Sequence, residues 1–217
     1  MKKIFDIGSN TGSFSKAYKD KYPDSEIICV EPAYDTIISS VDTTYAEFPD
    51  IKVLQYACSD KCNEKIDFYY NEFFHTISTC SRDWIQNSRF NNPNMYNNKW
   101  VKRQVRTVTI DFLLQKFGTP DYIKIDAEGY ELTVLKGLTK KVPFVGIEWA
   151  EELKTDIIGC VDRLKLLKFT KFALQETDDY LDLPGKKDYI DYNTIRDIIV
   201  KELDSNRKER WGMIYSS

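Results

Sequence analysis

The stretch "IFDIGSNTG" (residues 4–12) joins an apolar run, an acidic residue and two glycines within five positions. This pattern is typical of a strand that turns tightly into a helix, because glycine permits close backbone approach and positive φ. The start of the helix offers free N–H groups, so we expect a ligand at this turn. The candidate binding residues here are Asp6, Gly8, Ser9, Asn10, Thr11 and Gly12.

Apolar segments rich in β-forming residues alternate with helical patterns along the chain. Residues 2–57 read as strand, helix, strand, helix, strand, which is a βαβαβ unit. The alternation resumes after residue 110, and two last strands flank a long connection over residues 176–210, as in an antiparallel pair around an inserted helix. The pattern predicts an α/β fold with a mostly parallel sheet, helices on both faces and ligands at the carboxyl ends of the strands.

Composition indicates one ordinary globular unit. The 217 residues carry a net charge of -3 and 42% hydrophobic residues, so we expect a single domain over residues 1–217 and no global attraction to nucleic acid. The five cysteines form no CxxC pair and no zinc spacing, which favours a reducing compartment. Without a secretory h-region or a membrane-length apolar run, we expect a cytoplasmic protein.

The glycine turn narrows the choice of ligand. A dinucleotide site needs G-x-G-x-x-G, whereas this turn reads G-S-N-T-G. A ligand with an amine and a carboxylate suits it better, because Asp6 can accept the amine and the N–H groups of the turn can receive the carboxylate. S-adenosylmethionine has both groups.

The ends of the second and third strands extend this prediction. Glu31 follows "IICV" and precedes Pro32, at a place where a carboxylate can take both hydroxyls of a ribose. Ala57 and Cys58 follow the third strand and would form a wall beside the adenine. An ordinary strand end is an equally good explanation of that last pair.

Five segments, "FDIGSNTGSFS", "VEP", "ACSD", "VTIDFLL" and "DYIKIDAEGYELTVLKGL", resemble the FkbM family of S-adenosylmethionine-dependent methyltransferases, in the family's order, over roughly residues 2–150. The resemblance implies a class I methyltransferase (Rossmann-like) fold with seven strands and a C-terminal antiparallel pair. It also implies O-methylation of a hydroxyl on a sugar, a glycan or another small-molecule acceptor, with nucleic acid an unexpected partner. Family membership indicates the reaction class better than the substrate.

Three acidic residues are expected to converge on the edge of the sheet that faces this acceptor. Asp126 and Glu128 follow the strand "YIKI", and Glu148 lies at the end of the next strand. One interpretation is a Mg²⁺ or Mn²⁺ site that binds a diol. The other, which we favour slightly, is a metal-free carboxylate that takes the proton of the acceptor hydroxyl.

Two basic residues complete the expected catalytic set. Lys124 lies inside a buried strand, so it needs a partner such as Asp6, and we favour this role over direct catalysis. His75, the single histidine, is an alternative general base or a merely structural residue. Glu131 is expected at the surface.

Residues 72–103 form a distinct region that we interpret as an excursion on the substrate side. A cover for one sheet edge or an oligomer contact is the alternative. Its aromatic residues are Phe73, Phe74, Trp84, Phe90, Tyr96 and Trp100, which suit sugar faces. Its basic residues, with the adjacent Arg106, are Arg82, Arg89, Lys99, Lys102 and Arg103, which make an anionic or nucleotide-linked acceptor conceivable.

Two other functions remain open from the sequence. The basic stretch, together with Lys124 and Asp126, would also suit ribose 2′-O-methylation of RNA, which the net charge opposes. A non-catalytic domain that binds S-adenosylmethionine would keep the same fold and would bind the cofactor without turnover.

Overall fold

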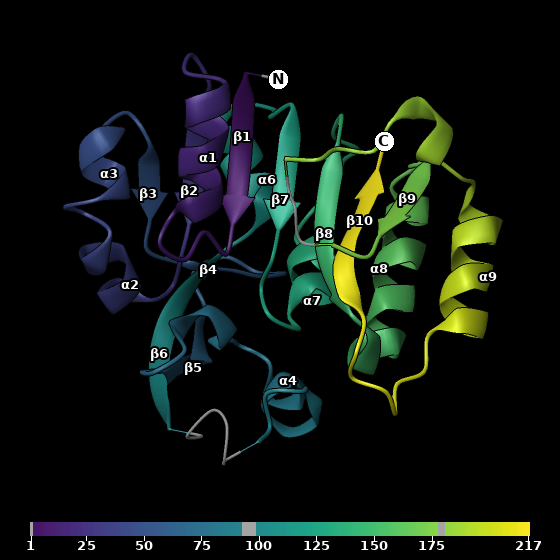
Figure 1. Ribbon diagram of the computed structural model, residues 1–217. Helices are drawn as coiled ribbons and strands as arrows, with labels where there is room; N and C mark the ends of the chain where they lie inside the picture. Colours follow the sequence, from purple (N-terminus) through teal and green to yellow (C-terminus); the bar gives the residue numbers. More distant parts are fainter. Residues whose placement is uncertain (1, 93–98, 178–180) are drawn as a thin grey trace.

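The computed structural model describes residues 2–92, 99–177 and 181–217. Its main sheet has seven strands in the order β3-β2-β1-β7-β8-β10-β9 (Figure 1). A smaller sheet has the order β4-β6-β5. The strands are β1 (Lys3–Ile7), β2 (Glu26–Val30), β3 (Lys52–Leu54), β4 (Ala57–Cys58), β5 (Lys65–Asn71), β6 (Trp100–Val108), β7 (Tyr122–Ile125), β8 (Val145–Ala150), β9 (Phe172–Gln175) and β10 (Trp211–Ser216).

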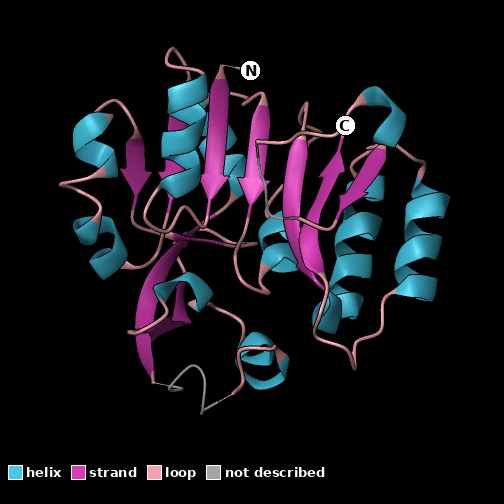
Figure 2. Cartoon of the chain, in the orientation of Figure 1, coloured by secondary structure: helices cyan, strands magenta, loops and turns pink. Residues whose placement is uncertain are grey.

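Helices separate most of these strands (Figure 2). They are α1 (Ser13–Lys21), α2 (Tyr34–Ser39), α3 (Thr44–Glu47), α4 (Arg82–Asn87), α6 (Ile110–Phe117), α7 (Glu131–Lys136), α8 (Lys154–Leu166) and α9 (Tyr192–Glu202), with short 3₁₀ turns at His75–Ile77, Glu151–Leu153 and Lys186–Asp188. Among the described residues, no helix combines the length and the apolar character needed to cross a bilayer.

Strand directions confirm the predicted architecture. β1 pairs in parallel with β2 and β7, and the parallel pairs β2–β3 and β7–β8 extend the sheet on either side. β10 runs antiparallel to both β8 and β9. The expected C-terminal antiparallel pair is therefore present, and α9 lies in the connection between its strands; residues 178–180 of that connection lie outside the described part of the chain.

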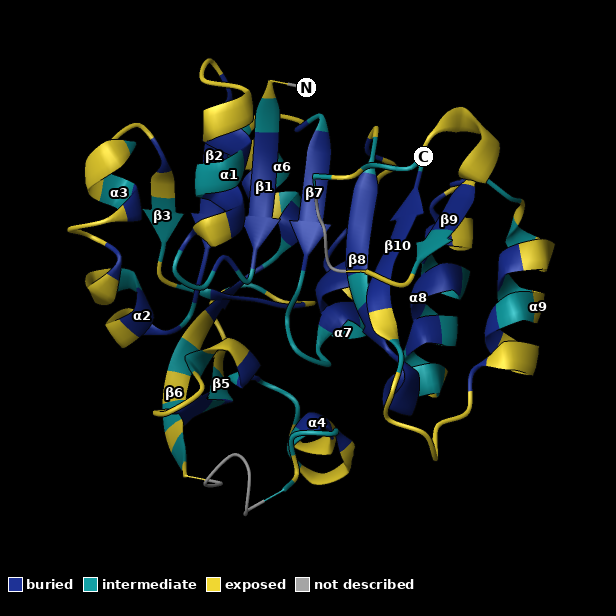
Figure 3. Ribbon diagram, viewed as in Figure 1, coloured by how far each residue is buried: buried dark blue, intermediate teal, exposed yellow. Residues whose placement is uncertain are grey.

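Alternating side chains divide the core between the two faces of the main sheet. Along β1, Ile4 packs in one hydrophobic cluster with α1, whereas Phe5 and Ile7 pack in the other, larger cluster with α6, α7 and α8. Successive strand residues point to opposite faces, so two helical layers cover one sheet. Figure 3 shows the central strands as the most continuously buried part of the molecule.

The predicted third strand over residues 51–57 is divided in the structure. β3 belongs to the main sheet, but β4 pairs with β6 instead. The Tyr56 N–H donates to the Leu54 carbonyl at 3.0 Å, which turns the chain away from the sheet between the two strands. This turn leads into the antiparallel pair of β5 and β6, which projects past the carboxyl ends of the main strands (Figure 1).

We refer to residues 65–108 as the arm. It contains β5, the 3₁₀ turn at His75–Ile77, α4 and β6, and so includes the predicted excursion. Residues 93–98, with the predicted aromatic Tyr96, lie outside the described residues.

Candidate active site

A cavity of about 610 Å³ lies where the carboxyl ends of β1, β2, β7 and β8 face the arm. Most of the residues predicted from the sequence share this cavity. Those that line it are Gly8, Ser9, Asn10, Thr11, Glu31, Pro32, Ala57, Cys58, His75, Lys124, Asp126, Glu128 and Glu148. Asp6 and Gly12 lie outside the lining.

Gly8 brings the turn after β1 against the end of β7. Its φ is +75°, and a Cβ atom there would lie 1.7 Å from the carbonyl oxygen of Asp126. Only a residue without a side chain permits this approach. The turn and the first acid of the rim are therefore in direct backbone contact.

Glu31 ties this turn to the end of β2. One carboxylate oxygen accepts from the Asn10 N–H at 2.9 Å, and the other accepts from the Ala33 N–H at 2.8 Å. Burial raises the pKa of Glu31 to about 7, although the two backbone hydrogen bonds oppose the shift. Each carboxylate oxygen has a second lone pair, so Glu31 can accept further hydrogen bonds from a ligand in the cavity.

Asp6 lies behind the residues that line the cavity. It is fully buried, and Oδ2 accepts from the Ser15 hydroxyl at 2.6 Å, on the α1 side of the sheet. Position 6 shares this side with Ile4 because strand side chains alternate. Its position behind the cavity lining therefore does not support direct contact with the amine of a ligand.

Lys124 lies between Asp6 and the rim. Its Nζ is 3.0 Å from Asp126 Oδ2 and 3.5 Å from Asp6 Oδ1. Burial lowers the pKa of Lys124, but the two carboxylates outweigh it and hold the pKa above its usual value. An ammonium that keeps its proton is a poor base, so the geometry favours a charge-balancing role for Lys124.

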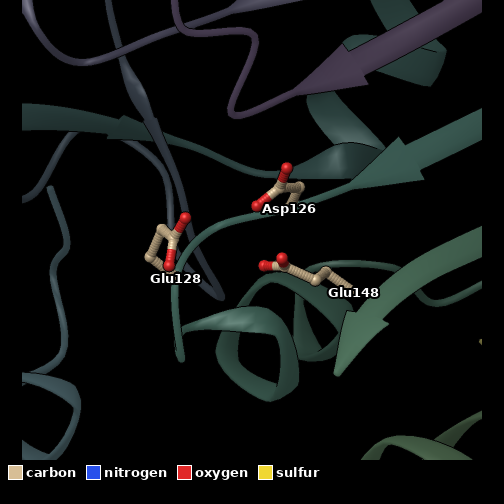
Figure 4. Close-up of side chains that lie close together, drawn as sticks. All are labelled: Asp126, Glu128 and Glu148. Atoms are coloured by element: carbon tan, nitrogen blue, oxygen red, sulfur yellow. The ribbon is translucent and has the colours of Figure 1, made fainter. Parts of the chain in front are cut away.

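Asp126, Glu128 and Glu148 form what we call the acid rim. Figure 4 shows the three carboxyl groups turned toward a common space, from the end of β7, the loop after it and β8. One oxygen of each lies within 4.8 Å of the others. Burial and the charge of Asp126 raise the pKa of both Glu128 and Glu148 well above the usual value.

These properties permit two kinds of chemistry. Carboxyl groups whose pKa is raised by burial can exchange a proton with a hydroxyl. An all-oxygen set of three ligands also fits Mg²⁺ or Mn²⁺.

The loop between β7 and α7 is held from both sides by residues that the sequence reasoning missed. Glu131, expected at the surface, is only 7% exposed, so that expectation is wrong. Its Oε1 accepts from the N–H groups of Ala127 at 2.8 Å and Gly129 at 3.2 Å. From the arm, the Thr79 hydroxyl donates to the Glu128 carbonyl at 2.7 Å.

These bonds hold Glu128 at φ +53°, a conformation that non-glycine residues rarely adopt. The sequence feature that could have predicted the role of Glu131 is its place at the start of a helix. A carboxylate in the first turn of a helix can reach back to preceding N–H groups.

Arg89 joins the arm to the 3₁₀ turn that follows β8 and to the residue that precedes β10. The Arg89 guanidinium donates to both carboxylate oxygens of Glu152, at 3.0 and 2.7 Å, and to the Arg210 carbonyl at 2.9 Å. It also lies 4.8 Å from the ring centroid of Trp211. Because Phe74, His75, Trp84 and Phe90 of the arm line the cavity, the arm forms one of its walls.

Most of the arm's basic side chains already have acidic partners. Arg82 and Lys102 contact Asp67, Arg103 contacts Asp35, and Arg89 contacts Glu152. This pairing offsets part of the positive charge that made an anionic or RNA acceptor conceivable.

The strand order, the antiparallel β10 and the cavity at the strand ends together define a class I methyltransferase fold. The family model described as the methyltransferase FkbM domain matches residues 6–158. The chain therefore belongs to the FkbM methyltransferase family. No curated protein matches the chain.

Several solved structures are similar in outline. Precorrin-6y C5,15-methyltransferase from Geobacter metallireducens has a TM-score of 0.48 and 9% identity, over 100% of this chain and 81% of that one. Aeropyrum pernix fibrillarin, solved with natively bound S-adenosyl-L-methionine, has a TM-score of 0.47 and 12% identity, over 100% and 66%. A putative O-methyltransferase from Klebsiella pneumoniae has a TM-score of 0.40 and 10% identity, over 99% and 72%.

Proposed function

We propose that this methyltransferase uses S-adenosylmethionine to methylate a hydroxyl of a sugar, a glycan or another small-molecule acceptor. The observation that carries the proposal is one cavity that contains both the Gly8–Glu31 end and the acid rim. A cofactor site and a proton acceptor thus face the same space. The odd set of five cysteines supports a cytoplasmic location as part of this proposal.

The residues at the first end fit the cofactor. Glu31 retains free lone pairs for ribose hydroxyls, and Ala57 and Cys58 provide an apolar wall. Asn10 Oδ1 lies on the lining, is buried and has no hydrogen-bond partner among the described residues, so it can accept from the amine of the cofactor. The cofactor supplies an electrophilic methyl group on a sulfonium.

The acid rim suits the other half of the reaction. The acceptor oxygen would form the new C–O bond while the methyl–sulfur bond breaks and its electron pair stays on sulfur. The proton of the acceptor hydroxyl must also leave. A rim carboxylate, or His75 from the arm, receives that proton. Holding the hydroxyl in line with the methyl group is the larger part of the task.

We keep the metal-free form of this mechanism. Lys124 already contributes a positive charge to Asp126, at 3.0 Å, and the raised pKa values of Glu128 and Glu148 suit proton transfer. Mg²⁺ or Mn²⁺ held by the rim is the alternative form. RNA methylation is disfavoured by the net charge of -3 and because four of the arm's cations, Arg82, Arg89, Lys102 and Arg103, are paired with acids.

Calorimetric titration with S-adenosylmethionine and S-adenosylhomocysteine tests the proposal, with NAD as the control and with or without magnesium. Micromolar binding of both sulfur nucleosides, but not NAD, supports it. A folded protein that binds neither overturns it. Binding without methyl transfer to any hydroxyl compound in a glycan and metabolite screen would instead indicate the non-catalytic domain.

A further inference from the structure

The two permanently cationic side chains that line the cavity are both neutralised by the protein. Among the described lining residues these are Lys124 and Arg89. Lys124 pairs with Asp126, and Arg89 makes a two-pronged contact with Glu152, whose side chain is 1% exposed. Neither cation is therefore available to an anionic group without breaking a buried ion pair.

Apart from His75, Cys58, Cys80 and Tyr130, the other ionisable residues of the described lining are acids. Glu31 lies at the cofactor end, and Asp126, Glu128 and Glu148 surround the place where the hydroxyl must react. A phosphate or carboxylate beside these groups would lose water without gaining a counter-charge, because both lining cations are already paired. Burying an anion without such a partner is costly.

Two side chains of the arm that line the cavity, Trp84 and His75, each have a buried ring nitrogen without a hydrogen-bond partner among the described residues. Trp84 is 3% exposed and lines the cavity, and its Nε1–H has no hydrogen-bond partner among the described residues. His75 Nδ1 is likewise buried and unpartnered. A buried indole N–H usually finds an oxygen acceptor.

Aromatic surface accompanies these groups. The rings of Trp84 and Phe90 lie 5.4 Å apart, and Phe74 and Trp211 add partly exposed rings to the same lining. Flat apolar rings next to isolated polar groups suit a sugar-like ring with hydroxyls on its edge.

We propose that the acceptor unit is an uncharged polyhydroxyl ring, one oxygen of which accepts a hydrogen bond from Trp84 Nε1–H. Units that carry a phosphate or a carboxylate are rejected because neither cation of the described lining is free to pair with them. This inference rests on the proposed function and narrows it, and it replaces the anionic acceptor that the basic residues of the arm suggested.

The test uses methyl-labelled S-adenosylmethionine, the full chain and an extract of glycans and polar metabolites from the source cells. Mild acid releases the labelled unit from sugar or nucleotide carriers but leaves phosphomonoesters and carboxylates intact. The products then pass over an anion exchanger at neutral pH. Label that is stable to alkali and appears in the unbound fraction supports the inference. Alkali is used because it hydrolyses a methyl ester, formed on a carboxylate, but not a methyl ether, formed on a hydroxyl. Alkali-stable label that stays on the column overturns the inference.

Absence of labelled product from a protein that binds the cofactor overturns the proposed hydroxyl methylation itself. That outcome differs from a charged product, so the two failures are distinguishable.

The role of Trp84 is tested with the labelled neutral fraction as acceptor. Trp84→Phe keeps a ring but removes the N–H, so KM for the acceptor should rise about tenfold, the value of one hydrogen bond. The affinity for S-adenosylmethionine should not change. Trp100→Phe, the same change in β6 outside the cavity lining, is the matched control. An unchanged KM in Trp84→Phe overturns the assigned hydrogen bond.

Discussion

Lys124 and Asp126 form a buried ion pair of 3.0 Å between Nζ and Oδ2, at the carboxyl end of β7. The same ammonium lies 3.5 Å from the fully buried Asp6 in β1. One ammonium group therefore balances the carboxylates at the adjacent ends of β1 and β7. The two acids have different surroundings, because Asp126 lines the cavity and Asp6 does not.

Replacing Lys124 by methionine should destabilise the protein strongly, because Asp6 and Asp126 would remain as uncompensated charges. Breaking a buried pair in this way costs about 3–5 kcal/mol of unfolding free energy, which urea denaturation measures. Lys201→Met removes an exposed pair with Asp197 and should leave the midpoint unchanged. Equal midpoints for the two variants would contradict the role assigned to Lys124.

Gly8→Ala should disrupt both the fold and the cofactor site. The new Cβ would overlap the Asp126 carbonyl, and φ of +75° is strained for alanine. The expected loss exceeds about 1 kcal/mol of unfolding free energy, with weaker binding of S-adenosylhomocysteine in calorimetry. Gly185→Ala is the control, because its φ of -74° suits alanine and its nearest neighbour is the end of the Asp188 side chain. Unchanged binding in Gly8→Ala would show that the turn does not form the site.

Glu131 should act by positioning Glu128 rather than by contacting substrate. In Glu131→Ala two backbone N–H groups lose their acceptor, at about 1–3 kcal/mol of unfolding free energy. We expect kcat to fall while the affinity for S-adenosylmethionine stays near that of the wild type. Glu131→Gln keeps an oxygen that can accept both bonds, so it should restore most of kcat. A shared loss in both variants would point to the charge instead.

The acid rim should control the rate of methyl transfer and not the affinity for S-adenosylmethionine. Asp126→Asn and Glu128→Gln should each lower kcat by about 10²–10⁴-fold, the usual contribution of a general base. His75→Gln, measured in parallel, identifies the base if it alone shows this loss. Activity that a chelator removes and magnesium or manganese restores would favour the cation form of the site. Full activity in both rim variants would show that the rim is misassigned.

Stability should fall as pH rises through the range in which Glu31 and Glu131 titrate. The pKa of each is raised by burial from 4.5 to about 7. Between these values the folded protein binds more protons than the unfolded chain, so the free energy of unfolding decreases with pH. Urea denaturation from pH 5 to 7.5 measures this slope, and Glu131→Gln should make it shallower. A slope of the opposite sign would contradict the burial of these two groups as the dominant effect.

Local patterns predicted the elements because strand and helix periodicity is a property of neighbouring residues. The order of β1, α1, β2 and the later strands followed from alternating apolar runs, and the antiparallel end of the sheet from the length of the last connection. The division of residues 51–57 was missed, since it depends on which strand lies beside residues 57 and 58.

The candidate site was predictable where residues lie at strand ends, because parallel strands bring these ends to one edge. Gly8, Glu31, Asp126 and Glu148 share the cavity for this reason. The roles of Asp6 and Glu131 were not predictable in the same way. The Asp6 side chain is fully buried against Ser15, and the Glu131 side chain turns back under the loop that precedes it.

The sequence by itself determined the alternation of elements, the glycine turn and the set of acids that end the central strands. Tertiary structure alone decided which charges face each other: Lys124 with Asp126, Arg89 with Glu152 and Asp67 with the arm's cations. The reason is physical. Backbone preference acts between neighbours in the chain, whereas burial and charge pairing depend on residues that meet only after the sheet and the arm have formed.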